Sequence, residues 1–189
     1  DEYYQMGTTN FAAIATRAMA AKTDAIDVAT MPPADVINFV RALTEAGYTG
    51  TLGALGGVGS LPVFQGAGGV EKLKAFYWLE VSPLDHPGII KLKAEYERLM
   101  KAAPPNNTLF PVFALAGEVA LRGVSAAGTD QDAEKIAEAL RRMPPESRYM
   151  GKAGWRGKSM YGINQEVTFP AGLGMVIDGK KLPVKTVEI

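Results

Sequence analysis

The chain has 189 residues, of which 47% are hydrophobic, so it is long and apolar enough to bury a sizeable core. Twenty basic and twenty acidic residues give a formal net charge of zero, and no basic tract stands out, which argues against a nucleic-acid partner. The absence of cysteine excludes disulfides and thiolate chemistry. No apolar run reaches the roughly 20 residues of a membrane-spanning helix, so direct membrane insertion is not expected.

The first part of the chain alternates between helical and strand patterns. Apolar residues at helical spacing predict a helix from Phe11, with Thr9 or Asn10 as its cap. Residues 24–29 predict a short strand, after which Pro32 and Pro33 open a second helix.

A glycine-rich loop follows the next predicted strand, residues 51–55, and ends at Ser60, where a short helix begins. Glycine has no Cβ, so a ligand can approach its backbone closely. Ligands of open α/β sheets bind at the carboxyl ends of strands, where this loop is expected. The loop matches neither GxxxxGK[ST] nor GxGxxG, so it is not a phosphate-binding sequence. Taken alone, it favours an ordinary turn.

An aromatic strand over residues 73–81, with Trp78 in the core, completes three strands of parallel βαβ type. A fourth strand is predicted around Tyr3. Three or four strands are few for a free-standing doubly wound domain. We therefore expect the chain, which begins at Asp1 without a methionine, to be a mature protein or a fragment of a longer one.

The second half is helix-rich and ends in strands. Pro87 opens one helix, Leu109 lies near the start of the next, and Thr129 or Asp130 caps a third. The remaining predicted strands cover residues 166–169, 174–177 and 182–187, with a hairpin turn at Asp178-Gly179.

Catalytic and metal-binding patterns are absent from the sequence. The single histidine, His86, stands between prolines and is interpreted as a solvent-exposed helix-start residue. Neither GxSxG, nor HExxH, nor an EF-hand loop occurs. We expect no catalytic residue, no metal and no cofactor, and hence no enzyme.

Several segments, taken in order, resemble one family. Gly7-Thr8-Thr9-Asn10-Phe11, a helix and then Asp24-Ala25-Ile26 resemble the "G-x-x-D-F…(helix)…D-x-I" passage of type I periplasmic solute-binding proteins, the leucine/isoleucine/valine-binding type. Asn10 stands where that pattern has Asp. The segment from Ala42 to Tyr48 is similar to the family's "A-R-E-x-G-Y", and residues 113–130 resemble its long helix and "A-G-T-D" turn.

The resemblance implies an α/β fold in which parallel βαβ units build an incomplete two-lobe architecture. Residues 1–82 would form part of ligand-binding lobe 2, and residues 83–165 the C-terminal helical part of lobe 1. Residues 166–189 would be a β-rich segment that crosses back between the lobes. Family members are normally much longer, so most of the first lobe and the opening βα unit of the second would be missing.

The resemblance also implies where a ligand would bind. The family places an aromatic residue in the loop after the first strand, where this chain has Met31 and Pro32. Its amino-acid binders place a Glu in the glycine-rich loop, where this chain has Gly56, flanked by Leu55 and Gly57. A buried ammonium without a carboxylate is costly, so these departures favour an apolar or aromatic carboxylate ligand. Phe110 is a further candidate, although helix-core packing explains it equally well.

The function implied by the resemblance is the periplasmic or extracellular, membrane-tethered solute-binding component of an ABC uptake transporter for amino-acid-like or apolar acids. Its partners would be a small-molecule ligand and a membrane permease. The same fold as the ligand-sensing domain of a receptor or regulator is the alternative. A fragment without independent function is another.

Overall fold

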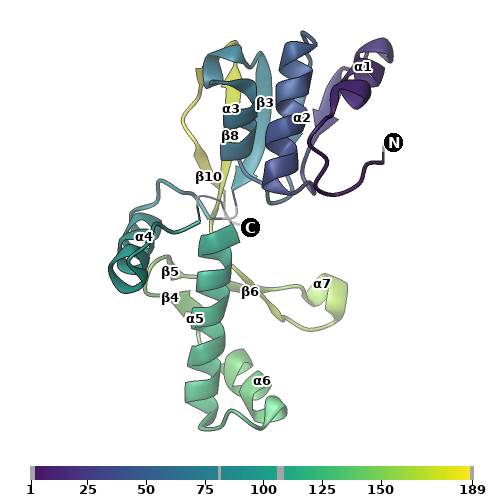
Figure 1. Ribbon diagram of the computed structural model, residues 1–189. Coiled ribbons are helices and arrows are strands. Elements are labelled where there is room, and N and C mark those ends of the chain that lie inside the picture. Colours follow the sequence, from purple (N-terminus) through teal and green to yellow (C-terminus); the bar gives the residue numbers. More distant parts are fainter. Residues whose placement is uncertain (1–2, 81, 106–108, 188–189) are drawn as a thin grey trace. The chain divides into compact units, whose positions relative to one another are not determined.

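The computed structural model describes residues 3–80, 82–105 and 109–187, which form two compact units (Figure 1). Unit 1 comprises Asp1–Glu80 and Gly172–Thr186, and unit 2 comprises Val81–Ala171 and Val187–Ile189. Each unit has its own hydrophobic cluster, and each is described separately below.

A six-stranded sheet is the centre of unit 1. The first three strands run parallel, with Asp27 opposite Gly53 and Gly53 opposite Tyr77. The strand Ala171–Ile177 runs antiparallel to the third of them, so that Trp78 pairs with Gly174. Along the sheet the order is β1 (Ala25–Asp27), β2 (Thr51–Ala54), β3 (Ala75–Glu80), β8 (Ala171–Ile177) and β10 (Lys185–Val187), with β9 (Lys180–Lys181) also paired to β8.

The helices of unit 1 contribute part of its core. They are α1 (Ala12–Ala20), α2 (Pro33–Glu45) and α3 (Leu61–Ala67), followed by the short 3-10 helix η1 (Val70–Lys72). Helix α2 buries one apolar face, formed by Val36, Phe39, Val40 and Leu43. A Cβ on Gly66 would lie 2.7 Å from the carbonyl oxygen of Ile37, so α2 and α3 cross closely at this glycine.

One face of β3 is aromatic and fully covered. Phe76 and Trp78 stack with ring centroids 5.1 Å apart, and Phe64 of α3 packs edge-on against both rings. Every second residue of β3 is buried, and the residues between them are half-buried. The period of two therefore places Phe76, Trp78 and Glu80 on the same interior face.

Unit 2 is built on helices and short strand pairs. Its core contains Ile89, Leu92, Leu115 and Tyr149. The elements are α4 (Pro87–Met100), α5 (Leu109–Ala127), α6 (Ala133–Arg142), α7 (Lys158–Tyr161), the paired strands β4 (Glu146–Ser147) and β5 (Gly151–Lys152), and the paired strands β6 (Gly154–Arg156) and β7 (Glu166–Thr168).

Helix α5 is long and apolar. By length and composition alone it is able to cross a membrane, with a mean hydropathy of 1.4 over 18 residues. Glu118 and Arg122 lie within it, however, and both bond to the β4–β5 region. Charged side chains are costly in hydrocarbon, and both of these are used to hold α5 against the hairpin.

Most predicted elements are present, and the differences lie at their ends. Described residues 3–11 contain no strand, so the strand expected around Tyr3 is wrong for the part that the structure describes. Helix α1 has Phe11 at its cap position, while the Asn10 side chain accepts a hydrogen bond from the Ala12 amide at 3.0 Å.

The cap of α6 also differs from the prediction, because Asp132 rather than Thr129 or Asp130 occupies it and accepts a hydrogen bond from the Lys135 amide. Thr129 instead closes a turn before the helix by accepting from the Gln131 amide. His86 does begin α4, as expected, but it is half-buried, with Nδ1 accepting from the Gly88 amide.

Candidate functional site

The carboxyl ends of β1, β2 and β3 meet at one edge of the unit 1 sheet. Parallel strands place the loops that follow them side by side, which is where open α/β sheets bind ligands. The Val28 amide donates to the carbonyl of Gly53, which extends the pairing of β1 and β2 to this edge. Met31 closes a turn by donating its amide to the Val28 carbonyl, and Pro32 takes the cap position of α2. Both side chains are half-buried.

The glycine-rich loop lies beside this turn. Leu55 is 51% exposed, and Gly56 is exposed as well. A Cβ on Gly56 would lie only 2.9 Å from the Cβ of Ala29, so the loops after β1 and β2 touch at this position. Gly57 has a φ of 99°, a conformation that disfavours any side chain. The structure thus brings Met31, Pro32, Leu55, Gly56 and Gly57 together at one edge.

Two buried polar residues at the same edge were not among the predicted site residues. Glu80, the last residue of β3, is 5% exposed, and Ser60, the residue before α3, is 4% exposed. The Ser60 hydroxyl donates to the Glu80 carboxyl group at 2.9 Å. The loop itself carries no acid, yet its last residue is bonded to one.

A sequence signal for Glu80 exists. It stands four residues after Phe76 and two after Trp78, so strand alternation places its carboxyl group in phase with two core aromatics. A charged residue type in phase with a core is rarely buried without a partner. That pattern predicts a buried polar contact, and the hydroxyl of Ser60 supplies it.

Phe110 lies in unit 2, in the first turn of α5. Its ring meets Tyr96 of α4 edge-on at a centroid distance of 5.1 Å, and it packs against the Ile89–Leu92 core. These contacts account for the half-buried ring as packing between α4 and α5. Its role toward a ligand stays a prediction.

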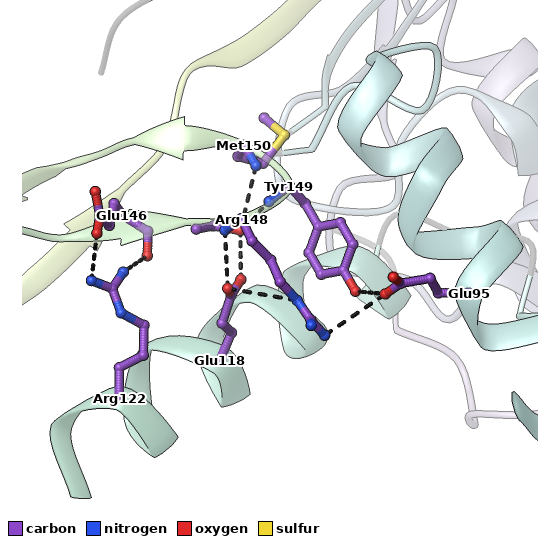
Figure 2. A network of polar contacts seen from close by, with 8 residues as sticks. Glu95, Glu118, Arg122, Glu146, Arg148, Tyr149 and Met150 are labelled. Carbon is purple, nitrogen blue, oxygen red and sulfur yellow. Dashed lines mark hydrogen bonds and ion pairs between the residues drawn. The ribbon is translucent and has the colours of Figure 1, made fainter. Parts of the chain in front are cut away.

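A network of polar contacts joins residues of unit 2 (Figure 2). Glu118 of α5 accepts hydrogen bonds from the Ser147 hydroxyl at 2.6 Å and the Arg148 amide at 3.0 Å. Arg122, one turn further along α5, bonds to both the backbone and the side chain of Glu146. These contacts hold the β4–β5 hairpin on α5.

Tyr149 connects the same hairpin to α4, because its phenol donates to the Glu95 carboxylate. This hydrogen bond, more than the nearby Arg148 guanidinium, lowers the pKa of Glu95. Burial and then the Glu95 hydrogen bond raise the pKa of Tyr149. The contacts of this network hold the β4–β5 hairpin against α4 and α5. Within the described ranges, no group of three or more His, Cys, Asp or Glu residues is placed to hold a metal.

Comparison with known proteins identifies a family for this chain. Residues 1–169 match the family model described as periplasmic binding protein. A leucine-binding protein from Thermotoga maritima matches with a TM-score of 0.64 and 20% identity over 98% of this chain and 50% of its own. A benzoate-bound solute-binding protein of an ABC transporter from R. palustris matches with a TM-score of 0.64 and 15% identity, again over 98% and 50%.

A second R. palustris solute-binding protein, solved with 4-hydroxybenzoate, gives a TM-score of 0.61 and 20% identity over 99% of this chain and 50% of its own. The chain therefore spans about half the length of these proteins. No curated protein sequence gives a significant match. At these identities the structures establish the α/β periplasmic-binding fold, of which the chain forms an incomplete part. The family match covers most of the chain, which thus belongs to the periplasmic binding proteins.

Proposed function

We propose that this chain is part of the solute-binding component of an ABC uptake transporter and performs no catalysis. The observation that carries the proposal is the edge of the unit 1 sheet, where two touching loops present glycine backbone and apolar side chains. Sites of this kind bind small molecules through shape and a few polar groups.

The proposed ligand is an apolar or aromatic carboxylate. Exposed Leu55 and half-buried Met31 and Pro32 give this edge an apolar character. Gly56 supplies no carboxylate for an ammonium group, and the nearby Glu80 is buried and already bonded to Ser60. Related structures contain benzoate and 4-hydroxybenzoate, and another is named for fatty acids, which agrees with this class.

The family membership supports a periplasmic location and a membrane permease as partner. In such a system the binding protein closes two lobes around its ligand and delivers it to the permease. Both the compartment and the partner are proposals for the whole protein rather than for this half-length chain.

A thermal-shift screen of the full-length protein tests the ligand class. We expect benzoate, 4-hydroxybenzoate and a medium-chain fatty acid to raise the melting temperature more than leucine does, because only leucine brings an ammonium group to be desolvated. The largest shift with leucine would overturn the ligand class. No shift with any small solute would overturn the binding function.

Gly56→Glu is the matched variant, with Gly56→Gln as its uncharged control. Both add similar bulk against Ala29, but only Glu adds a carboxylate. We expect Glu alone to improve the response to leucine relative to benzoate, since a carboxylate at this loop would pair with the ammonium. Equal responses of the two variants would show that position 56 does not face the ligand.

A further inference from the structure

Glu80 occupies a junction in the chain. It is the last residue of unit 1 before the chain passes to unit 2. Across the sheet it pairs with Gly172, the first residue of unit 1 after the chain returns. The paired residues Glu80 and Gly172 are therefore the positions at which the chain leaves unit 1 and re-enters it.

The side chain of Glu80 reaches a different part of the same unit. Its carboxyl group accepts the Ser60 hydroxyl hydrogen bond at 2.9 Å, and both residues are at least 95% buried. A serine before a helix usually caps it by accepting from the first-turn amides. Ser60 makes no such cap contact within the described residues, because its hydroxyl is directed to β3 instead.

The loop that Ser60 ends is conformationally permissive. Gly57 and Gly59 have φ values of 99° and 71°, and glycine reaches many other conformations at similar cost. At its beginning the loop is fixed by the close approach of Gly56 to Ala29. At its end it is fixed by the hydrogen bond between Ser60 and Glu80, so that bond helps to decide which loop conformation is populated.

We propose that Glu80 is a positioning residue, which through Ser60 holds the glycine-rich loop in its ligand-binding conformation and couples that loop to the two crossings between the units. This rests on the proposed function for the role of the loop toward a ligand. The coupling itself is independent of any ligand. If position 80 only had to be buried, an apolar residue would suffice there. Glu80 instead requires the desolvation of a carboxyl group, which costs free energy.

Hydrogen exchange of the 189-residue chain, read by mass spectrometry, tests the coupling. We expect Ser60→Ala to speed exchange in peptides covering residues 55–60 and in those covering 80–84 and 170–174, by about fivefold to tenfold, the scale of one lost hydrogen bond. Glu80→Leu should do the same. Glu80→Gln should retain protection near wild type, because its side-chain oxygen still accepts from Ser60.

The double variant Ser60→Ala/Glu80→Leu should exchange no faster than either single variant, since both remove the same bond. Ser147→Ala is the control, because it removes a part-buried serine–glutamate hydrogen bond in unit 2. It should leave residues 55–60 unchanged. Additive effects in the double variant, or an equal rise over all of unit 1 with Ser60→Ala, would overturn the proposal. If Ser60→Ala does not fold, the contrast between Glu80→Gln and Glu80→Leu decides.

Calorimetry on the full-length protein with benzoate tests the consequence for binding. Ser60→Ala should weaken affinity about tenfold, and Glu80→Gln should preserve it within about twofold. Unchanged affinity in Ser60→Ala would overturn the positioning role. If wild type binds no solute, the proposed function fails, whereas the exchange result still decides the coupling of loop and crossings.

Discussion

Single glycines decide how closely the sheet of unit 1 packs. A Cβ on Gly174 of β8 would lie 2.0 Å from the ring of Trp78, which is fully buried. Only a missing side chain lets the indole lie over the neighbouring strand. The Trp78 ring also packs against Phe64 and Phe76, so it has little room to move aside.

Gly174→Ala is therefore expected to destabilise the chain by about 1–3 kcal/mol through overpacking. Urea unfolding followed by circular dichroism measures the change. Gly117→Ala is the control, because it lies inside α5 and, apart from its chain neighbours and the nearby backbone of that helix, no described atom lies within 4 Å of its added Cβ. It should stabilise by roughly 0.5–1 kcal/mol through helix propensity. An unchanged midpoint for Gly174→Ala would contradict the close packing.

The Tyr149–Glu95 hydrogen bond makes part of the stability pH-dependent. Because the folded pKa of Glu95 is lowered, its contribution is present above its unfolded pKa of about 4.3 and is lost as the pH falls through the folded pKa. The raised pKa of Tyr149 affects stability at alkaline pH. Its contribution is complete below about pH 10 and is lost as the pH rises through the folded pKa.

Tyr149→Phe removes the phenol donor, so we expect the pKa of Glu95 to rise toward its ordinary value and the loss of stability in acid to become shallower. NMR titration of the Glu95 side-chain carbon measures the pKa directly. Tyr96→Phe, on the same helix as Glu95, should leave it unchanged because the Tyr96 ring contact with Phe110 is kept. An unchanged Glu95 pKa in Tyr149→Phe would show that the hydrogen bond does not form.

At the scale of elements, α5 has two different faces. Pro111, Leu115, Val119 and Gly123 are buried, whereas Phe113 and Leu121 are 70% and 72% exposed. The exposed side chains line a hollow of about 540 Å³ with Arg122, Arg148 and Tyr149. An apolar stripe of this kind on a free surface favours association or dye binding.

Phe113→Ser/Leu121→Ser should lower binding of an apolar dye such as ANS and reduce self-association of the 189-residue chain, while its melting temperature changes little. Fluorescence titration and analytical ultracentrifugation measure the two effects. Leu115→Ser, at a buried position of the same helix, is the contrasting variant and should destabilise by more than about 2 kcal/mol. Undiminished dye binding in the double serine variant would place the apolar surface elsewhere.

At the scale of the whole molecule, the chain spans half the length of the solved binding proteins. A ligand enclosed between two lobes needs contacts from both, and affinity falls when part of the enclosure is lacking. Calorimetry with benzoate and leucine should therefore show weak binding or none for the isolated 189-residue chain. Tight binding of either acid to this chain would contradict that expectation.

The sequence by itself determined the alternation of α2, β2, α3 and β3, because helical stripes, strand runs and punctuating prolines and glycines are local signals. It also determined the family, through motifs that recur in order along the chain, and the fold class that follows from it. Helix caps were misplaced by one to three residues at α1 and α6, because Asn10 and Thr129 bond to turns next to the helix starts.

Only the tertiary structure decided which residues share the edge of the sheet. The approach of Gly56 to Ala29 depends on the register of β1 and β2, and the bond between Ser60 and Glu80 joins residues 20 positions apart. Local sequence patterns do not show which residues distant in the sequence come into contact. The sequence thus predicted a glycine-rich loop without an acidic residue. The tertiary structure shows that β3, which packs against α3, places the buried carboxyl group of Glu80 within hydrogen-bond distance of Ser60 at the end of that loop.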